Sequence, residues 1–179
     1  MGWNKTFNLV SRGQTNNLDD HILDSLSILP HIGDNLIDLG SGAGFPGIPI
    51  AIVSANKRVF LVEPSQKRAS FLFHVCSGLE LKNTKILNKR AEELSPQDFP
   101  QPYEILTRAF GTTKKTIKAT KRLMEAPLAK LTMMKTAPFQ DHETLTDQFE
   151  ITRTTNTRSK GKNKQHILVT IEKTNKCTR

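Results

Sequence analysis

The sequence predicts an α/β fold with a doubly wound, mostly parallel sheet and an antiparallel hairpin at one edge. Short apolar runs of strand length alternate with segments of helical periodicity between residues 18 and 134. A glycine-rich loop follows the first of these runs directly. The last β-run, residues 166–172, comes after a polar stretch and not after a helix, so we expect it to lie antiparallel to its neighbour.

The first expected element is a helix that begins near residues 18–20 and ends at Pro30, because Ile22, Leu26 and Leu29 share one helical face. A buried parallel strand is expected at residues 35–40, since a short apolar run there ends in glycine. Further strands are expected at residues 58–63, 84–88, 103–107 and 130–134, and further helices at residues 48–54, 65–79 and 112–124.

The expected helix at residues 65–79 has both a start signal and a buried face. Ser65 is a suitable N-cap residue, because its side-chain oxygen could accept from an unpaired N–H of the first turn. Ala69, Leu72, Phe73 and Cys76 form the predicted apolar stripe.

Positive charge is concentrated at the C-terminal end. The 179-residue chain has a formal net charge of +9, but residues 1–150 contribute +2 and residues 151–179 contribute +7. A basic segment on a nearly neutral domain is typical of proteins with polyanionic partners, because lysine and arginine displace counterions from phosphates. A solvated face that keeps the protein in solution is the alternative interpretation.

The cysteines and the hydropathy pattern indicate in which cellular compartment the protein is expected. Cys76 and Cys177 are far apart and lack the spacing of metal ligands, so we expect no metal and a reducing, cytoplasmic environment. The sequence contains neither an apolar stretch of membrane-spanning length nor a signal-peptide pattern. We therefore expect no membrane association.

The loop of residues 38–44 is the main functional signal. Its glycines allow a tight turn and close approach of the backbone to a ligand, at the carboxyl end of a strand where α/β sheets bind ligands. Gly42, Gly44 and Gly47 match the dinucleotide fingerprint, so an NAD(P)-dependent Rossmann oxidoreductase is one interpretation.

Two features of the loop favour S-adenosylmethionine over a dinucleotide. The carboxylate of Asp38, two residues before Gly40, would repel a pyrophosphate but attract the ammonium of a methionine moiety, directly or through water. Pro46 and Pro49 remove N–H donors where a pyrophosphate would need them. Glu63, at the end of the next strand, could accept hydrogen bonds from both ribose hydroxyls, or could simply pair with Lys67 or Arg68.

Several blocks of the sequence together resemble the RsmG (GidB) family. They are Trp3-Asn4-Lys5 with Asn8-Leu9, the block at residues 21–25, the loop extended to Pro49, Lys67-Arg68 with Phe71-Leu72, residues 90–93, and Arg108-Ala109-Phe110. The blocks occur in the order of the family and cover most of residues 3–135. The resemblance implies a Rossmann-like, class I S-adenosylmethionine-dependent methyltransferase, with residues 1–179 as a single domain. An N-terminal helical remnant (1–33) would precede a Rossmann-like core with a basic C-terminal hairpin (34–179).

The resemblance also implies an activity and a set of cofactor contacts. Such a protein would be a bacterial, cytoplasmic enzyme of rRNA processing that methylates N7 of a guanine in 16S rRNA of the small ribosomal subunit. We expect it to act as a monomer. With the loop residues included, the cofactor contacts are expected at Asp38, Gly40, Gly42, Phe45, Glu63, Ala91, Glu92 and Arg108.

The reaction needs no dedicated general base, because guanine N7 carries its own lone pair, so the enzyme mainly positions and desolvates its substrates. Arg108, at the end of a strand, is the candidate for facing the cofactor or the guanine; a structural salt bridge is the alternative. His21 more plausibly packs or caps. Residues 153–164 are expected to form a flexible basic loop that grips phosphates. The expected RNA contacts are Arg12, Arg158, Lys160, Lys162 and Lys164.

Two alternatives to the methyltransferase stay open from the sequence. One is the NAD(P)-dependent oxidoreductase, which lacks an obvious substrate domain. The other is a non-catalytic RNA-binding descendant of the methyltransferase.

Overall fold

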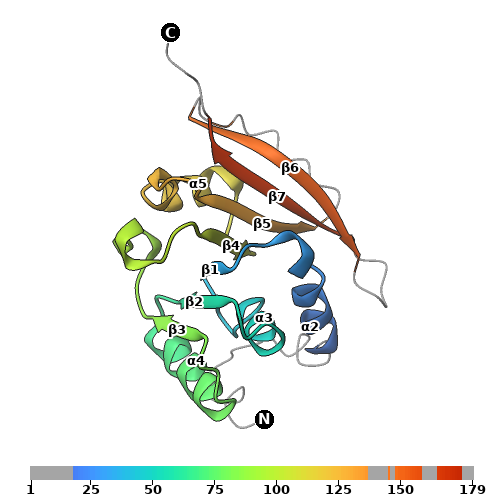
Figure 1. Cartoon of the computed structure of the whole chain (residues 1–179), viewed down its shortest axis with the longest axis vertical. Coiled ribbons are helices and arrows are strands. Elements are labelled where there is room, and N and C mark those ends of the chain that lie inside the picture. Colours follow the sequence, from blue (N-terminus) through green and yellow to red (C-terminus); the bar gives the residue numbers. More distant parts are fainter. Residues whose placement is uncertain (1–17, 137–144, 146–147, 159–164, 175–179) are drawn as a thin grey trace.

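The computed structural model describes residues 18–136, 145, 148–158 and 165–174 (Figure 1). The strands are β1 (Asn35–Leu39), β2 (Arg58–Val62), β3 (Thr84–Leu87), β4 (Glu104–Arg108), β5 (Lys130–Thr136), β6 (Phe149–Arg158) and β7 (Gln165–Lys173). The helices are α2 (Leu18–Leu26), α3 (Gly47–Val53), α4 (Gln66–Gly78) and α5 (Thr113–Thr120). Short 3-10 helices lie at Leu29–His31, Ala91–Glu93, Pro96–Asp98 and Leu123–Glu125.

The strands form one sheet in the order β3-β2-β1-β4-β5-β7-β6. Strands β1 to β5 pair in parallel, whereas β7 is antiparallel to both β5 and β6. The order reverses between β1 and β4, which is the position where doubly wound sheets bind ligands. The predicted doubly wound sheet with an antiparallel edge hairpin is confirmed.

Two apolar cores cover the two faces of the sheet, because successive strand residues point to opposite sides. Leu36, Leu61 and Leu106 face the core that α3 and α4 close, with Ile50 and Leu72 among its members. The neighbouring residues Ile37, Phe60 and Ile105 face the other core.

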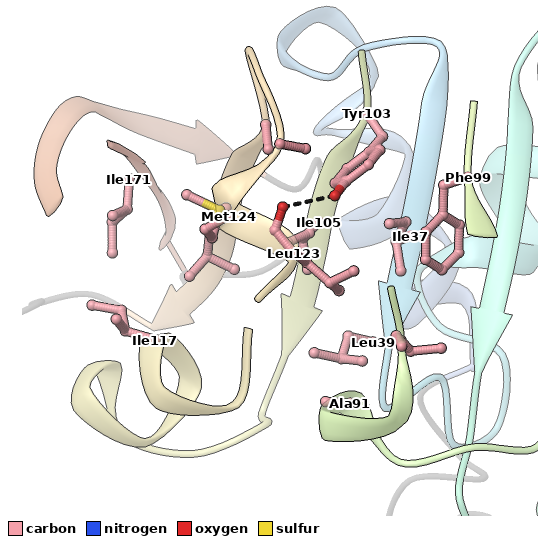
Figure 2. Close-up of a cluster of buried hydrophobic side chains, with 14 of the residues drawn as sticks. Ile37, Leu39, Ala91, Phe99, Tyr103, Ile105, Ile117, Leu123, Met124 and Ile171 are labelled. Atoms are coloured by element: carbon pink, nitrogen blue, oxygen red, sulfur yellow. Dashed lines mark hydrogen bonds between the residues drawn. The ribbon is translucent and has the colours of Figure 1, made fainter. Parts of the chain in front are cut away.

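Figure 2 shows that second core, in which Ile117 of α5 and the 3-10 helices Ala91–Glu93 and Leu123–Glu125 pack on the sheet. The Tyr103 hydroxyl donates to the main-chain oxygen of Leu123 at 2.7 Å, and burial raises the pKa of Tyr103 to about 12. Phe99 packs edge-on against both Phe60 and Tyr103.

Helix α2 buries a different face from the predicted one. Asp24 and Ser25 are buried, whereas Ile22 and Leu26 are half-buried. The helix therefore turns polar side chains toward the sheet, and Asp24 finds an ionic partner there.

The predicted stripe of α4 is partly wrong. Ala69, Leu72 and Cys76 are buried, but Phe73 is 65% exposed. The buried arc extends from Leu72 toward the half-buried Phe71 and Val75, on the side of α3, so Phe73 lies just beyond its edge. Ser65 occupies the N-cap position, but its side chain makes no capping hydrogen bond.

The predicted basic loop at residues 153–164 begins too early. Residues up to Arg158 belong to β6, which pairs with β7 through a register shift between Ile151 and Arg153. The strand is polar along much of its length because it lies at the edge of the sheet, where both faces can meet water. Within the described part of the chain, no helix combines the length and apolar character needed to cross a bilayer.

Candidate functional site

Three of the predicted site residues lie at the carboxyl ends of adjacent strands. Asp38 is near the end of β1, Glu63 directly follows β2, and Arg108 ends β4; these three strands are neighbours in the sheet. The parallel pairing brings their carboxyl ends to one edge, so side chains far apart in the sequence meet there. This carboxyl edge is the candidate site.

The glycine loop is shaped by close packing against β1. The Gly40 backbone has a φ of +78°, a conformation that side chains rarely adopt. Gly47, the first residue of α3, lies so close to the sheet that a Cβ there would be 2.4 Å from Leu61 Cδ2 and 2.6 Å from Asp38 Oδ2. Glycine at position 47 therefore lets α3 approach both the sheet and the Asp38 carboxylate.

Asp38 is buried and makes hydrogen bonds to the glycine loop and to the first residue of α3. Its Oδ2 accepts a hydrogen bond from the Gly47 N–H at 3.0 Å, and Ser41 Oγ donates to its main-chain oxygen at 2.8 Å. The residue is 1% exposed, and Oδ1 has no hydrogen-bond partner among the described residues. Burial raises the pKa of Asp38 to about 7, although the hydrogen bond from Gly47 and the charge of Arg108 act to lower it.

Glu63 also binds the loop through its carboxylate. Oε2 accepts from the Gly42 N–H at 3.0 Å, and Oε1 accepts from the Ser65 N–H at 2.9 Å. Arg68, which the sequence offered as an alternative partner, lies 3.9 Å from Oε1 and is half-exposed. Each carboxylate oxygen has a further lone pair, so these bonds leave acceptor capacity for a ligand.

Arg108 contacts helix α2 across the edge of the sheet. Its Nη2 lies 2.5 Å from His21 Nδ1, while Nη1 is buried and has no hydrogen-bond partner in the described part of the chain. Burial lowers the pKa of Arg108, and the carboxylates of Asp24 and Asp38 act to raise it. His21 therefore packs beside the site, and its ring also lies 5.5 Å from that of Phe45.

Asp24 and His166 complete the polar network, and the sequence did not indicate this pair. Asp24 Oδ2 lies 3.0 Å from His166 Nε2. His166 is opposite Thr136 in the β5–β7 pairing, which places it at the carboxyl end of β5. Asp24 stands inside the sequence block at residues 21–25, but nothing in the sequence pairs that block with the last strand.

The other predicted cofactor residues surround this edge with different exposures. Phe45 is half-buried, and Glu92 is exposed. Ala91 is buried, its methyl group belongs to the core of Figure 2, and it begins the 3-10 helix Ala91–Glu93.

The predicted RNA contacts are largely beyond the described structure. Arg12, Lys160, Lys162 and Lys164 lie outside the described residues. Arg158 ends β6. Residues 18–136, 145, 148–158 and 165–174 contain no group of three or more potential metal ligands.

An apolar groove of about 370 Å³ runs between α2, α3 and α4, outside the carboxyl edge. Leu18, Ile52, Val53 and Leu79 line it and are each at least half-exposed. Phe45, one of the predicted cofactor contacts, also lines this groove, and its ring lies near that of His21.

Solved structures with similar folds are methyltransferases. A SAM-dependent methyltransferase from Aquifex aeolicus superposes with a TM-score of 0.61 at 15% identity and covers 94% of this chain and 97% of that protein. A putative rRNA methylase from Clostridium thermocellum gives a TM-score of 0.56 at 18% identity, covering 83% and 92%. The chain thus has the Rossmann-like fold of class I S-adenosylmethionine-dependent methyltransferases, as the sequence predicted.

Sequence comparison identifies the family. The family described as rRNA small subunit methyltransferase G (GidB) matches residues 1–168, and the chain belongs to it. A relative named ribosomal RNA small subunit methyltransferase G from Nitrosomonas eutropha is 41% identical over 125 residues, 69% of this chain and 58% of the relative. The relative of that name from Alteromonas mediterranea is 36% identical over 157 residues, 86% of this chain and 73% of the relative.

The resemblance drawn from the sequence blocks is therefore confirmed. The matched part spans less than two thirds of the Nitrosomonas relative, so the activity of the whole protein is a matter for proposal.

Proposed function

We propose that this protein transfers a methyl group from S-adenosylmethionine to N7 of a guanine in 16S rRNA of the small ribosomal subunit. The chain belongs to the family described as rRNA small subunit methyltransferase G (GidB). The observation that carries the proposal is a pair of buried polar atoms at the candidate site. Asp38 Oδ1 and Arg108 Nη1 belong to neighbouring strands and both have no hydrogen-bond partner among the described residues. Buried polar atoms of this kind normally have partners, so a ligand that supplies both is favoured.

The methionine end of the cofactor has the chemistry that this pair requires. Its ammonium would be attracted to the Asp38 carboxylate, directly or through water, and its carboxylate would accept from the Arg108 guanidinium. A pyrophosphate would instead be repelled by the negative charge of Asp38. The loop geometry thus fits a cationic cofactor without phosphate better than NAD(P).

The remaining proposed contacts follow the edge of the sheet. Glu63 retains acceptor capacity for the ribose hydroxyls after binding Gly42 and Ser65. Gly40 and Gly42 allow the backbone to approach the ligand closely. Phe45, Ala91 and Glu92 would border the methionine and adenine ends.

The chain's own residues would act by positioning. When bound, the cofactor supplies an electrophilic methyl group on a sulfonium. Because guanine N7 already has a lone pair, no residue has to remove a proton. Asp38 and Glu63 would fix the orientation of the cofactor, and Arg108, held by His21, would keep one guanidinium nitrogen toward it. We further propose 16S rRNA or the small subunit as the partner, a monomeric state and a cytoplasmic location.

Calorimetric titration with S-adenosylmethionine and, separately, with NAD tests the cofactor. We expect binding of S-adenosylmethionine and none of NAD. Tight NAD binding with no response to S-adenosylmethionine would reject the proposal in favour of the oxidoreductase.

Methyl transfer tests the acceptor. Small-subunit particles that lack 7-methylguanosine are incubated with the protein and labelled cofactor, and the nucleosides are identified by mass spectrometry. We expect 7-methylguanosine in these particles and no further transfer to particles that already contain it. Cofactor binding and RNA binding without turnover would instead identify a non-catalytic descendant.

A further inference from the structure

The exposed face of α5 carries an unusual concentration of positive charge. Between residues 111 and 126 the sequence has five cations and one acid, Glu125. The cations are all exposed, and we call them the basic face of α5: Lys114, Lys115, Lys118, Lys121 and Arg122. The opposite face is buried and consists of Thr113, Thr116, Ile117 and Thr120. The helix is thus anchored by one side and presents only cations on the other.

This arrangement opposes the stability of the helix itself. Lys114 and Lys118, and again Lys118 and Arg122, are like charges four residues apart, which repel each other on a helix surface. The first turn contains Lys114 and Lys115 and no acid, although the positive end of the helix dipole favours acids there. Sequences that break local rules in this way tend to do so at functional surfaces.

Three cations of the basic face have no ionic partner in the described part of the protein. The side chains of Lys118, Lys121 and Arg122 make no ion pair with residues 18–136, 145, 148–158 or 165–174. These charges are therefore available to an external anion.

The basic face begins next to the candidate site. Gly111 follows Arg108 by three residues, and Lys135 Nζ donates to its main-chain oxygen at 3.0 Å. The side chain of Lys115 passes over the same glycine, with Cδ 3.6 Å from where a Cβ would stand. Lys121 and Arg122 lie in the turn that directly follows α5, and from Lys115 to Arg122 the helix and this turn together advance about 10 Å, a length comparable with roughly three successive phosphates of one strand.

We propose that the basic face of α5 binds the phosphodiester backbone of the RNA substrate and guides it toward the carboxyl edge of the sheet. This inference rests on the proposed function, since it assigns RNA as the polyanion. A lipid surface fits less well, because the apolar side of α5 is buried in the core and the exposed side offers no apolar residue for insertion.

The test compares two triple variants with the same change of charge. The first, K118Q/K121Q/R122Q, removes charge from the basic face and leaves Lys115 beside the site unchanged. The control, R58Q/K82Q/K85Q, removes three exposed cations at β2 and β3, at the other end of the sheet. Glutamine has a helix propensity close to that of lysine, so the first variant should fold, and the control should fold because it changes only exposed side chains. Circular dichroism and titration with S-adenosylhomocysteine check folding and cofactor binding, which we expect to be unchanged.

Binding to a 16S rRNA transcript is then measured across a series of KCl concentrations. We expect K118Q/K121Q/R122Q to bind at least tenfold more weakly at 0.1 M salt and to lower the slope of log K against log salt by about 2 to 3, because about one counterion is released for each phosphate contact. In methyl transfer to small-subunit particles, KM should rise while kcat is retained. The control should resemble the wild type.

Three results would overturn the inference. Equal losses in both variants would indicate a general effect of net charge, and unchanged RNA binding in the first variant would exclude this surface. Loss of binding to phosphatidylglycerol vesicles with RNA binding intact would assign the face to a membrane. An inactive wild type would refute the proposed function alone, because the salt dependence of RNA binding still tests the basic face.

Discussion

Replacing Gly47 by alanine tests the packing that forms the candidate site. The added Cβ would lie 2.4 Å from Leu61 Cδ2 and 2.6 Å from Asp38 Oδ2, both about 1 Å inside ordinary contact. Helix α3 would have to move away from the sheet, at a cost of about 1–3 kcal/mol for overpacking. The hydrogen bond from the Gly47 N–H to Asp38 would weaken with it, for about 1 kcal/mol more.

We therefore expect Gly47→Ala to lower the free energy of unfolding by about 2–4 kcal/mol, measured by chemical denaturation. Gly78→Ala is the matched control, because a Cβ at the last residue of α4 meets nothing within 4 Å. That variant should be about 0.4–1 kcal/mol more stable than the wild type. A Gly47→Ala protein within about 0.5 kcal/mol of the wild type, with cofactor affinity intact, would refute the packing argument.

Three further predictions address the polar groups. Asp38→Asn keeps an acceptor for Gly47 but cannot ionise. Because burial raises the pKa of Asp38 to about 7, the unfolding free energy of the wild type relative to this variant should fall by roughly 3 kcal/mol between pH 4 and pH 7. A difference that is flat or rises with pH would contradict this prediction. Tyr103→Phe should cost about 1 kcal/mol in urea unfolding, since it removes the hydrogen bond to Leu123, and a neutral effect would contradict that bond. A double-mutant cycle with Asp24→Asn and His166→Gln should give a coupling energy of about 0.5–3 kcal/mol, whereas additive effects would argue against the pair.

The central sheet could be predicted because its signals are local. The inner parallel strands are buried on both faces, so a short apolar run is enough to reveal them, as at Asn35–Leu39. The glycine loop and the acids Asp38 and Glu63 are also fixed by their position after such runs. The structure brings these residues together at the carboxyl edge of the sheet.

Strand β6 shows the limit of local sequence signals for predicting a strand. Its sequence consists mostly of threonine and charged residues, and only Phe149 and Thr157 are buried among its described side chains. An edge strand has a single neighbour and can be polar on both faces, so hydrophobic periodicity does not mark it. Its β-branched threonines were the available signal.

The contacts of Arg108 with His21 and of Asp24 with His166 could not be predicted for a different reason. Arg108 meets His21 across 87 positions of the sequence, and Asp24 meets His166 from the far end of the chain. Such contacts depend on the strand order, and the buried polar face of α2 runs against the apolar periodicity that predicted the helix. The assignment of residues 1–33 as a helical remnant stays a prediction.

The contact between Asp24 and His166 has a consequence for the order of events during synthesis. Helix α2 leaves the ribosome early, whereas β7 is among the last elements to be made. Until then, the carboxylate of Asp24 beside Arg108 lacks the contact with His166. A nascent chain can therefore complete this group of polar side chains only after translation has passed β7.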